Sequence, residues 1–361
     1  MTKKPTATIA INILIISTYV EEIVKANNIL FMPAMTAPSH VKSMLPLAKA
    51  LRKDGHSISL AQYYSEQKEK LSEDNVEFIY LSTYGESLMD EKFANSVWRA
   101  KTVIPWGNVM TGWAAGEVFN TFIVDYECPK PAKLSKEYLQ FVEDPVSKGT
   151  IILSFGHFAD WKAAPVATIQ AVSSAFENLQ QYRIIWQFNG DLSVVSNTSH
   201  VRIETWVPLA AILQHPKTVL FITHTGIKSF LEAVCFATPV VAVPLFGDQP
   251  RYSMLASMHG FGIRLDKTTL TKEALYNTII AVAENRKYKE RIAKFRGMIS
   301  DRIIDATSNG KFWINFYLRH PSSANRMRLK GTMLNSFTYS CYDVFTLLCI
   351  LLFSLRSAID S

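Results

Sequence analysis

The second half of this 361-residue chain alternates short apolar stretches with longer amphipathic ones, and this order restricts the possible folds. The pattern predicts strands at 150–155, 183–188, 219–223, 239–244 and 261–265. It predicts helices at 165–179, 208–214, 227–237, 249–258, 271–284 and 286–300. A strand-then-helix order repeated this often is typical of a parallel, doubly wound sheet with helices on both faces.

The N-terminal part begins with the same order but does not complete it. A strand is expected in NILFMP (28–33), a helix in SHVKSMLPLAKALRKDG (39–55), and further strands at 56–61 and 76–81. A doubly wound domain takes about 100–200 residues, and the chain up to residue 126 supplies only its start. Residues 127–149 are rich in Pro and Lys and predict a linker.

Both ends of the chain carry apolar segments. Two lysines followed by ATIAINILIISTYV (7–20) are typical of a secretory signal peptide, expected over 1–26, with a buried strand or helix as the alternative. An apolar run from Val344 to Leu355 lies near the C-terminus. Because a spanning helix takes about 20 residues, we expect a membrane anchor over 337–355, with a buried core helix as the alternative.

Charge and cysteine content exclude several classes of function. The net charge of +7 is spread along the chain without an aromatic-interleaved basic stripe, so no nucleic-acid partner is expected. The four cysteines have no metal-binding spacing and predict no disulfide framework. The sequon Asn197-Thr198-Ser199 lies in a polar stretch, and Asn197 would be glycosylated if the chain were translocated.

The stretch FITHTGIKSFLEAV (221–234) places polar residues where a strand gives way to a helix. Ligands of open parallel sheets bind beyond the carboxyl ends of the strands, and a helix N-terminus suits phosphate. Gly226 permits a close backbone approach, Ser229 offers a hydroxyl and Lys228 a positive charge. The stretch therefore predicts an anion site beside His224, with an ordinary capped helix as the alternative.

Three other turns carry groups suited to a nucleotide sugar. Ser154 ends a strand in SFGH, and Trp206 follows a short apolar piece in ETWVP. An exposed tryptophan can stack on a base, although such a residue more often belongs to a core. Asp248 and Gln249 end the next strand in PLFGDQP and can bond several sugar hydroxyls, or instead begin a helix.

The run WVPLAAILQHPKTVLFITHTGIKSFLEAVCFATPVVAVPLFGDQP (206–250) closely resembles the signature of the UDP-glycosyltransferases, in particular the animal UDP-glucuronosyltransferase branch. Its short motifs follow the family's order and spacing: W-V-P, H-P-K-T, F-I-T-H-x-G, E-A, P-L-F and D-Q. The resemblance extends over about 129–355, and LFMPAMTAPSHVKSMLPLAKALRKDGHSISL (30–60) resembles the family's first strand, loop and helix.

This resemblance implies a GT-B fold of two doubly wound, Rossmann-like domains. Residues 27–126 would form a truncated acceptor domain and 150–320 the UDP-sugar donor domain, followed by the C-terminal membrane anchor. The resemblance implies the donor-binding residues Ser154, Trp206, Val207, His224, Gly226, Lys228, Ser229, Glu232, Asp248 and Gln249. In the family pattern Trp206 stacks on uracil, His224 contacts the diphosphate and Glu232 holds the ribose.

His40 occupies the position of the family's catalytic base. An imidazole of near-neutral pKa can take the proton of an acceptor hydroxyl, which then attacks the anomeric carbon of the sugar. The resemblance thus implies inverting transfer of glucuronate or glucose to a small lipophilic acceptor. It implies no cofactor and no metal, attachment to the endoplasmic reticulum membrane by a single span with lumenal domains, and oligomers with family members.

The chain departs from the family pattern at several points. Leu209 replaces a glutamine, Thr225 a glycine and Lys228 an asparagine. Near Tyr126 and Glu127 the resemblance passes directly from the early N-terminal domain to the linker. The family segment in between supplies the aspartate that orients the base, and neither Asp90 nor Asp125 has a matching context. A non-catalytic UDP-sugar-binding homologue is therefore the alternative function.

Overall fold

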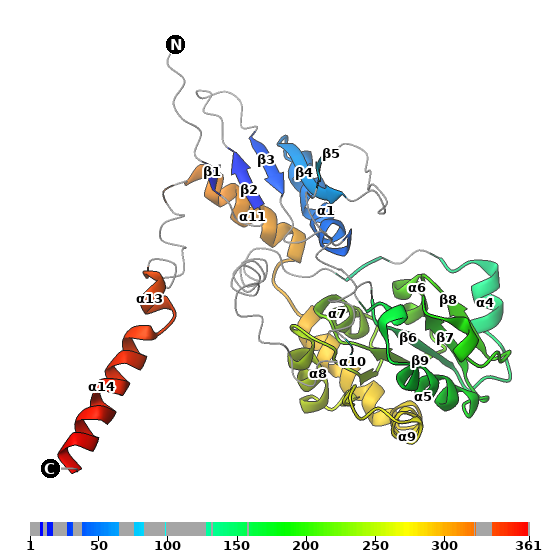
Figure 1. The fold of residues 1–361 in the computed structure, drawn as a ribbon. Coiled ribbons are helices and arrows are strands. Elements are labelled where there is room, and N and C mark those ends of the chain that lie inside the picture. Colours follow the sequence, from blue (N-terminus) through cyan, green and yellow to red (C-terminus); the bar gives the residue numbers. More distant parts are fainter. Residues whose placement is uncertain are drawn as a thin grey trace.

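The computed structural model describes residues 8–9, 13–16, 27–31, 38–64, 76–82, 98, 128–130, 133–156, 159–320, 322 and 334–359. They form two α/β units, each built on its own sheet, and a C-terminal helix that projects away from both (Figure 1).

The C-terminal unit contains a six-stranded parallel sheet with the order β11-β10-β9-β6-β7-β8. Its strands are β6 (Thr150–Ser154), β7 (Arg183–Gln187), β8 (Val201–Glu204), β9 (Thr218–Thr223), β10 (Val240–Ala242) and β11 (Gly262–Arg264). Five of them confirm the predicted strands. The sixth, β8, was not predicted, because VRIE is short, only half-buried and carries two charges.

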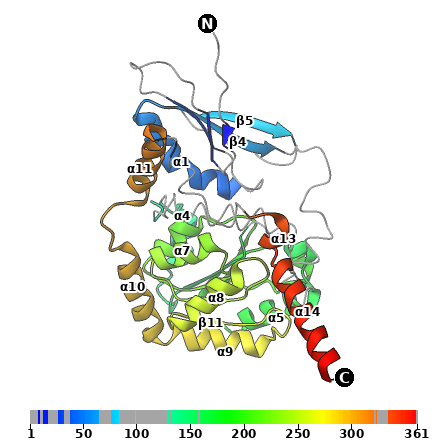
Figure 2. The ribbon, with the colours of Figure 1, turned by 90° about the vertical axis from the view of Figure 1, so that its left-hand side faces the viewer.

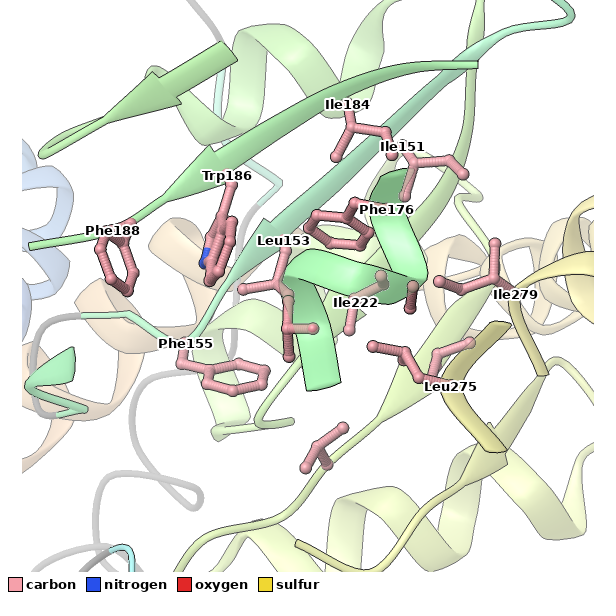
Figure 3. Packing of buried hydrophobic residues seen from close by; sticks show 14 of the residues in the cluster. Ile151, Leu153, Phe155, Phe176, Ile184, Trp186, Phe188, Ile222, Leu275 and Ile279 are labelled. Carbon is pink, nitrogen blue, oxygen red and sulfur yellow. The ribbon is translucent and has the colours of Figure 1, made fainter. Parts of the chain in front are cut away.

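Helices cover both faces of this sheet and confirm the predicted helices. They are α5 (Val166–Glu177), α6 (Leu209–Gln214), α7 (Ile227–Cys235), α8 (Gln249–Met258), α9 (Lys272–Ala283) and α10 (Arg286–Ser300), with short turns η1 (Trp161–Ala163) and η2 (Leu192–Val194). Figure 3 shows the core on one face, where Phe176 of α5 and Leu275 of α9 pack with strand residues such as Trp186. All five residues of β6 are buried, as expected for a central parallel strand.

The N-terminal unit has a five-stranded sheet with the order β1-β2-β3-β4-β5. Its strands are β1 (Thr8–Ile9), β2 (Ile13–Ile16), β3 (Asn28–Phe31), β4 (Ser57–Tyr64) and β5 (Glu77–Ser82), and α1 (Pro38–Lys53) links β3 to β4. The last three strands are parallel, whereas β1 and β2 pair antiparallel. Residues 1–26, where a signal peptide was expected, thus contribute two short strands.

Helix α11 (Ala306–Arg319) follows the donor-domain pattern in sequence but packs on the N-terminal unit beside α1 (Figure 2). Ile314 is buried in the N-terminal core. Lys311 Nζ lies 2.7 Å from Asp54 Oδ1, and His56 Nε2 lies 2.9 Å from Asn315 Oδ1. The structure therefore assigns the end of the predicted 150–320 domain to the N-terminal unit.

The segment predicted as a membrane anchor is divided into two helices, α13 (Ser336–Tyr339) and α14 (Tyr342–Ile359). Cys341 lies between them in a left-handed conformation with φ of 57°. Nowhere in the described part of the chain is a helix both long enough and apolar enough to cross a membrane.

A disulfide joins Cys128 to Cys235 across 107 residues. The expectation was only that the cysteines form no disulfide framework, and this single bond was not predicted, because sequence spacing cannot show that two distant cysteines become neighbours. The bond ties the start of the 127–149 segment, which also contains α4 (Lys136–Val142), to the last residue of α7. Cys341 and Cys349 are free and exposed.

Candidate functional site

The predicted donor-site residues gather at the carboxyl edge of the C-terminal sheet. Ser154 is the last residue of β6, and His224 directly follows the neighbouring strand β9. Asp248 comes after β10, the next strand in the sheet, and Trp206 comes just after β8. Since all these strands are parallel, their carboxyl ends share one edge, which is where ligands of such sheets bind.

His224 is the centre of this edge. Its side chain is only 8% exposed, and its Nδ1 is buried with no hydrogen-bond partner among the described residues. Burial lowers the pKa of His224 to about 4, so the ring is neutral at pH 7. A buried polar atom without a partner costs about 1–3 kcal/mol, which a ligand that bonds to it would offset.

Two glycines lie so close to the imidazole ring of His224 that a side chain at either position would contact it. A Cβ at Gly226 would lie 2.7 Å from His224 Nε2, and a Cβ at Gly156 would lie 3.1 Å from His224 Cε1. Gly156 also has a φ of +71°, which favours glycine. The backbone therefore approaches the ring from β6 and from α7, and larger residues at either position would displace it.

The threonine that replaces the family's glycine occupies a strained position. Thr225 has a φ of 57°, a conformation that costs an L-residue roughly 1–2 kcal/mol. The residue is fully buried, its N–H donates to Thr223 Oγ1 at 3.1 Å, and its hydroxyl donates to the His224 carbonyl at 2.6 Å. These bonds hold the turn in the shape that a glycine would adopt without strain.

Helix α7 points its N-terminus at the same edge. Gly226 is its N-cap and has no side chain to satisfy the first N–H groups, while Ser229 is buried in the first turn. Further along the helix, burial raises the pKa of Glu232 to about 7, and attraction by Lys228 opposes this shift. Glu232 is thus a half-buried carboxyl that is partly protonated near neutral pH, one turn beyond Lys228.

Asp248 and Gln249 do not play equivalent parts. Burial raises the pKa of the Asp248 carboxyl, an effect that nearby backbone N–H groups oppose, and its Oδ2 is buried with no partner in the described structure. Gln249 is 3% exposed, and its Oε1 accepts from the N–H groups of Leu245 (2.8 Å) and Phe246 (3.0 Å). The amide oxygen of Gln249, which was expected to bind the sugar, therefore stabilises the loop that contains Gln249.

Sequence reasoning missed Gln187, the last residue of β7. Ser154 Oγ donates to Gln187 Oε1, and Gln187 Nε2 donates to the Thr205 carbonyl at 3.4 Å. Gln187 thereby connects β6 with the residue before Trp206, whose side chain is 65% exposed, whereas Val207 is buried. Gln187 could have been found from the sequence, because it lies at the carboxyl end of a predicted strand, where the other site residues lie.

For the predicted base, His40, the structure describes the backbone only. His40 is the third residue of α1, as expected, but its side chain lies outside the described residues, as do Asp90 and Asp125. The described part of the chain contains no group of acidic, histidine or cysteine residues arranged to hold a metal.

Comparison with known proteins is consistent with this geometry. Residues 117–357 match the profile of the family described as UDP-glucoronosyl and UDP-glucosyl transferase. The chain is 32% identical to UDP-glucuronosyltransferase 2B14 of Oryctolagus cuniculus over 224 residues, which are 62% of this chain and 41% of that protein. It is 31% identical to human UDP-glucuronosyltransferase 2B7 over 63% of this chain and 43% of that protein. The chain thus matches less than half the length of these relatives.

Solved structures with the same fold include Arabidopsis thaliana UGT89C1 complexed with UDP, with a TM-score of 0.56 and 11% identity over 76% of this chain and 95% of that one. The glycotransferase of kitacinnamycin aligns with a TM-score of 0.50 and 13% identity over 78% and 95% of the two chains. These likenesses show the GT-B arrangement of two parallel α/β units. The chain therefore belongs to the family of UDP-glucuronosyl- and UDP-glucosyltransferases.

Proposed function

We propose that the carboxyl edge of the C-terminal sheet binds a UDP-sugar. The observation that carries this proposal is the buried, neutral His224, which has an unpartnered nitrogen and lies against the N-cap of α7 between two glycines. A helix N-terminus with close backbone approach suits a diphosphate. That Arabidopsis UGT89C1, a protein of the same fold, was solved with UDP supports this assignment.

Each part of the donor would meet a different element. The uracil would stack on the exposed ring of Trp206 and pair with the backbone of Val207. The diphosphate would lie between His224 and the first turn of α7, the ribose hydroxyls would reach Glu232, and the sugar would face Asp248. No metal is required in this arrangement, because the helix N-terminus and His224 stabilise the diphosphate charge.

Transfer itself would involve the N-terminal unit. His40 would take the proton of an acceptor hydroxyl while the hydroxyl oxygen attacks the anomeric carbon. The bond from that carbon to the diphosphate oxygen would break, and UDP would leave with the bonding electron pair, inverting the carbon. The acceptor would be a small lipophilic alcohol or phenol, and the sugar glucuronate or glucose.

The alternative is a UDP-sugar-binding homologue without transferase activity. One observation favours it: the matched part of the chain covers only 41–43% of the length of its curated relatives. The resemblance to the family implies that the segment expected to orient His40 is among the parts without a counterpart. Binding of UDP without transfer would distinguish this alternative from the enzyme.

Replacing Trp206 by alanine should weaken UDP binding by about 1–3 kcal/mol, because the stacked base loses its aromatic partner. Trp206→Phe is the matched control, since it keeps a ring and should retain most of the affinity. Isothermal titration calorimetry with UDP measures both variants. An alanine variant that binds as tightly as the unaltered protein would remove Trp206 from the site.

We also propose that the α/β units lie in the lumen of the endoplasmic reticulum, attached to its membrane through residues 337–355. The Cys128–Cys235 disulfide supports an oxidising compartment, and α14 exposes apolar side chains such as Leu348 and Phe353.

Asn197 is exposed on the loop before β8. When the chain is made in microsomes, we expect an endoglycosidase-sensitive mass shift that Asn197→Gln abolishes. An unmodified Asn197 in a protease-accessible domain would contradict this topology.

A further inference from the structure

Gln187 lies between the two ends of the proposed donor site. Along the carboxyl edge of the sheet the strands follow the order β9-β6-β7-β8, so three inter-strand spacings separate His224, after β9, from Trp206, after β8. At about 4.8 Å each, these spacings amount to about 14 Å. A nucleotide that contacts both ends would span this distance, and Gln187 is the last residue of β7, in between.

The backbone at Gln187 is held in place by its two neighbours. Trp186 and Phe188 are buried, and their rings pack in the hydrophobic core with centroids 4.7 Å apart (Figure 3). Because successive side chains of a strand point to opposite faces, the half-buried Gln187 side chain points to the other face of the sheet from these rings. A long polar side chain is thus presented from a rigid position.

The Gln187 amide connects β6 with the loop that follows β8. Ser154 Oγ donates to Gln187 Oε1, and Gln187 Nε2 donates to the Thr205 carbonyl at 3.4 Å. A carbonyl can only accept, so the amide nitrogen must face Thr205 and the amide oxygen must face Ser154. The pairing of β7 with β8 reaches Glu204 opposite Gln187. Gln187 therefore holds the loop just beyond this ladder, directly before Trp206.

Ser154 extends the connection toward His224. Its Oγ accepts from the Gly156 N–H at 3.3 Å, and a Cβ at Gly156 would lie 3.1 Å from the ring of His224. Ser154 is 1% exposed, and its single hydroxyl proton is used in the bond to Gln187. A phosphate oxygen needs a donor, so it could receive this proton only if the bond to Gln187 were broken.

We propose that Gln187 is a positioning residue, which fixes the loop of Trp206 relative to His224 so that one nucleotide can contact both. It acts through its hydrogen bonds to Thr205 and Ser154 and touches no ligand atom itself. As a consequence, Ser154 contributes to nucleotide binding through Gln187 and not by donating to phosphate. This inference rests on the proposed donor site.

The first test removes the amide. Gln187→Leu keeps a branched side chain of similar size but loses both hydrogen bonds, so UDP affinity measured by calorimetry should fall about 3- to 10-fold. Gln214→Leu, at the exposed end of α6 and away from the carboxyl edge of the sheet, makes the same exchange and should leave UDP affinity unchanged.

The readout specific to positioning is the coupling of Gln187 with Trp206. In the unaltered protein, Trp206→Ala should weaken UDP binding at least about 5-fold. In the Gln187→Leu background the same change should weaken it less than about 2-fold, because the ring is no longer held where the base can stack on it. A merely structural role of Gln187 would leave the full effect of Trp206→Ala in place.

Ser154→Ala tests the other side of the connection. If Ser154 acts through Gln187, the double variant with Gln187→Leu should bind UDP about as well as the weaker-binding of the two single variants. Losses of affinity that multiply would show that Ser154 contacts UDP on its own, and would overturn the inference.

Two further results would overturn the inference: unchanged UDP affinity in a Gln187→Leu protein that shows a normal unfolding transition, or the full effect of Trp206→Ala in that background. Should Gln187→Leu fail to fold, Ser154→Ala provides the same comparison with Trp206→Ala. An unaltered protein that binds no UDP would instead overturn the proposed donor site, and the inference with it.

Discussion

Replacing His40 by alanine should lower sugar transfer by about 10²–10⁴-fold in a chain whose missing family segment has been restored between Tyr126 and Glu127. This is the range that general-base catalysis contributes. In the proposed mechanism the base would touch the acceptor hydroxyl and not the nucleotide, so UDP affinity should stay the same. The measurement is transfer of radiolabelled sugar from UDP-glucuronate and UDP-glucose to a panel of phenols and sterols.

Lys53→Ala, at the exposed end of the same helix, is the matched control and should leave transfer intact. The 361-residue chain itself should transfer sugar weakly or not at all. A base that lacks its orienting carboxylate loses much of its effect, and transfer needs both substrates held within about 3–3.5 Å. Strong transfer by the unaltered chain would contradict the importance of the missing segment. Full activity of His40→Ala would exclude His40 as the base.

Removing the disulfide should have the largest effect on stability. Replacing both Cys128 and Cys235 by serine should lower the free energy of unfolding by about 2–5 kcal/mol, because the bond restrains a long loop in the unfolded chain. Chemical denaturation under non-reducing conditions measures the difference. The control is replacement of Cys341 and Cys349, which are free and exposed and should be neutral. Equal stability of both double variants would show that the disulfide contributes nothing.

The regular part of the C-terminal unit could be predicted because its signals are local. The strand TIILS of β6 is apolar and fully buried, and α7 begins one residue after a glycine, at the predicted position 227. The turn after β9 could be predicted for the same reason, since only Thr225 separates His224 from Gly226 in the sequence. Short patterns of this kind do not depend on the rest of the fold.

The features that were missed depend on distant parts of the chain. The partner of Cys128 lies 107 residues away, and α11 packs against α1, near the start of the chain. A local feature also escaped prediction: the amide oxygen of Gln249, a predicted sugar ligand, accepts from two backbone N–H groups of its own loop, a geometry that the motif alone does not show. Similarly, Gly156 could not be linked to His224 from sequence, because the contact arises from the pairing of β6 with β9.

The direct test of the proposed donor site is a calorimetric titration of the 361-residue chain with UDP. We predict saturable binding of one UDP per chain, weakened by His224→Ala, because the neutral imidazole beside α7 is the centre of the proposed site. Absence of binding at millimolar UDP, in a protein shown to be folded by its unfolding transition, would contradict the assignment of this edge of the sheet as a donor site.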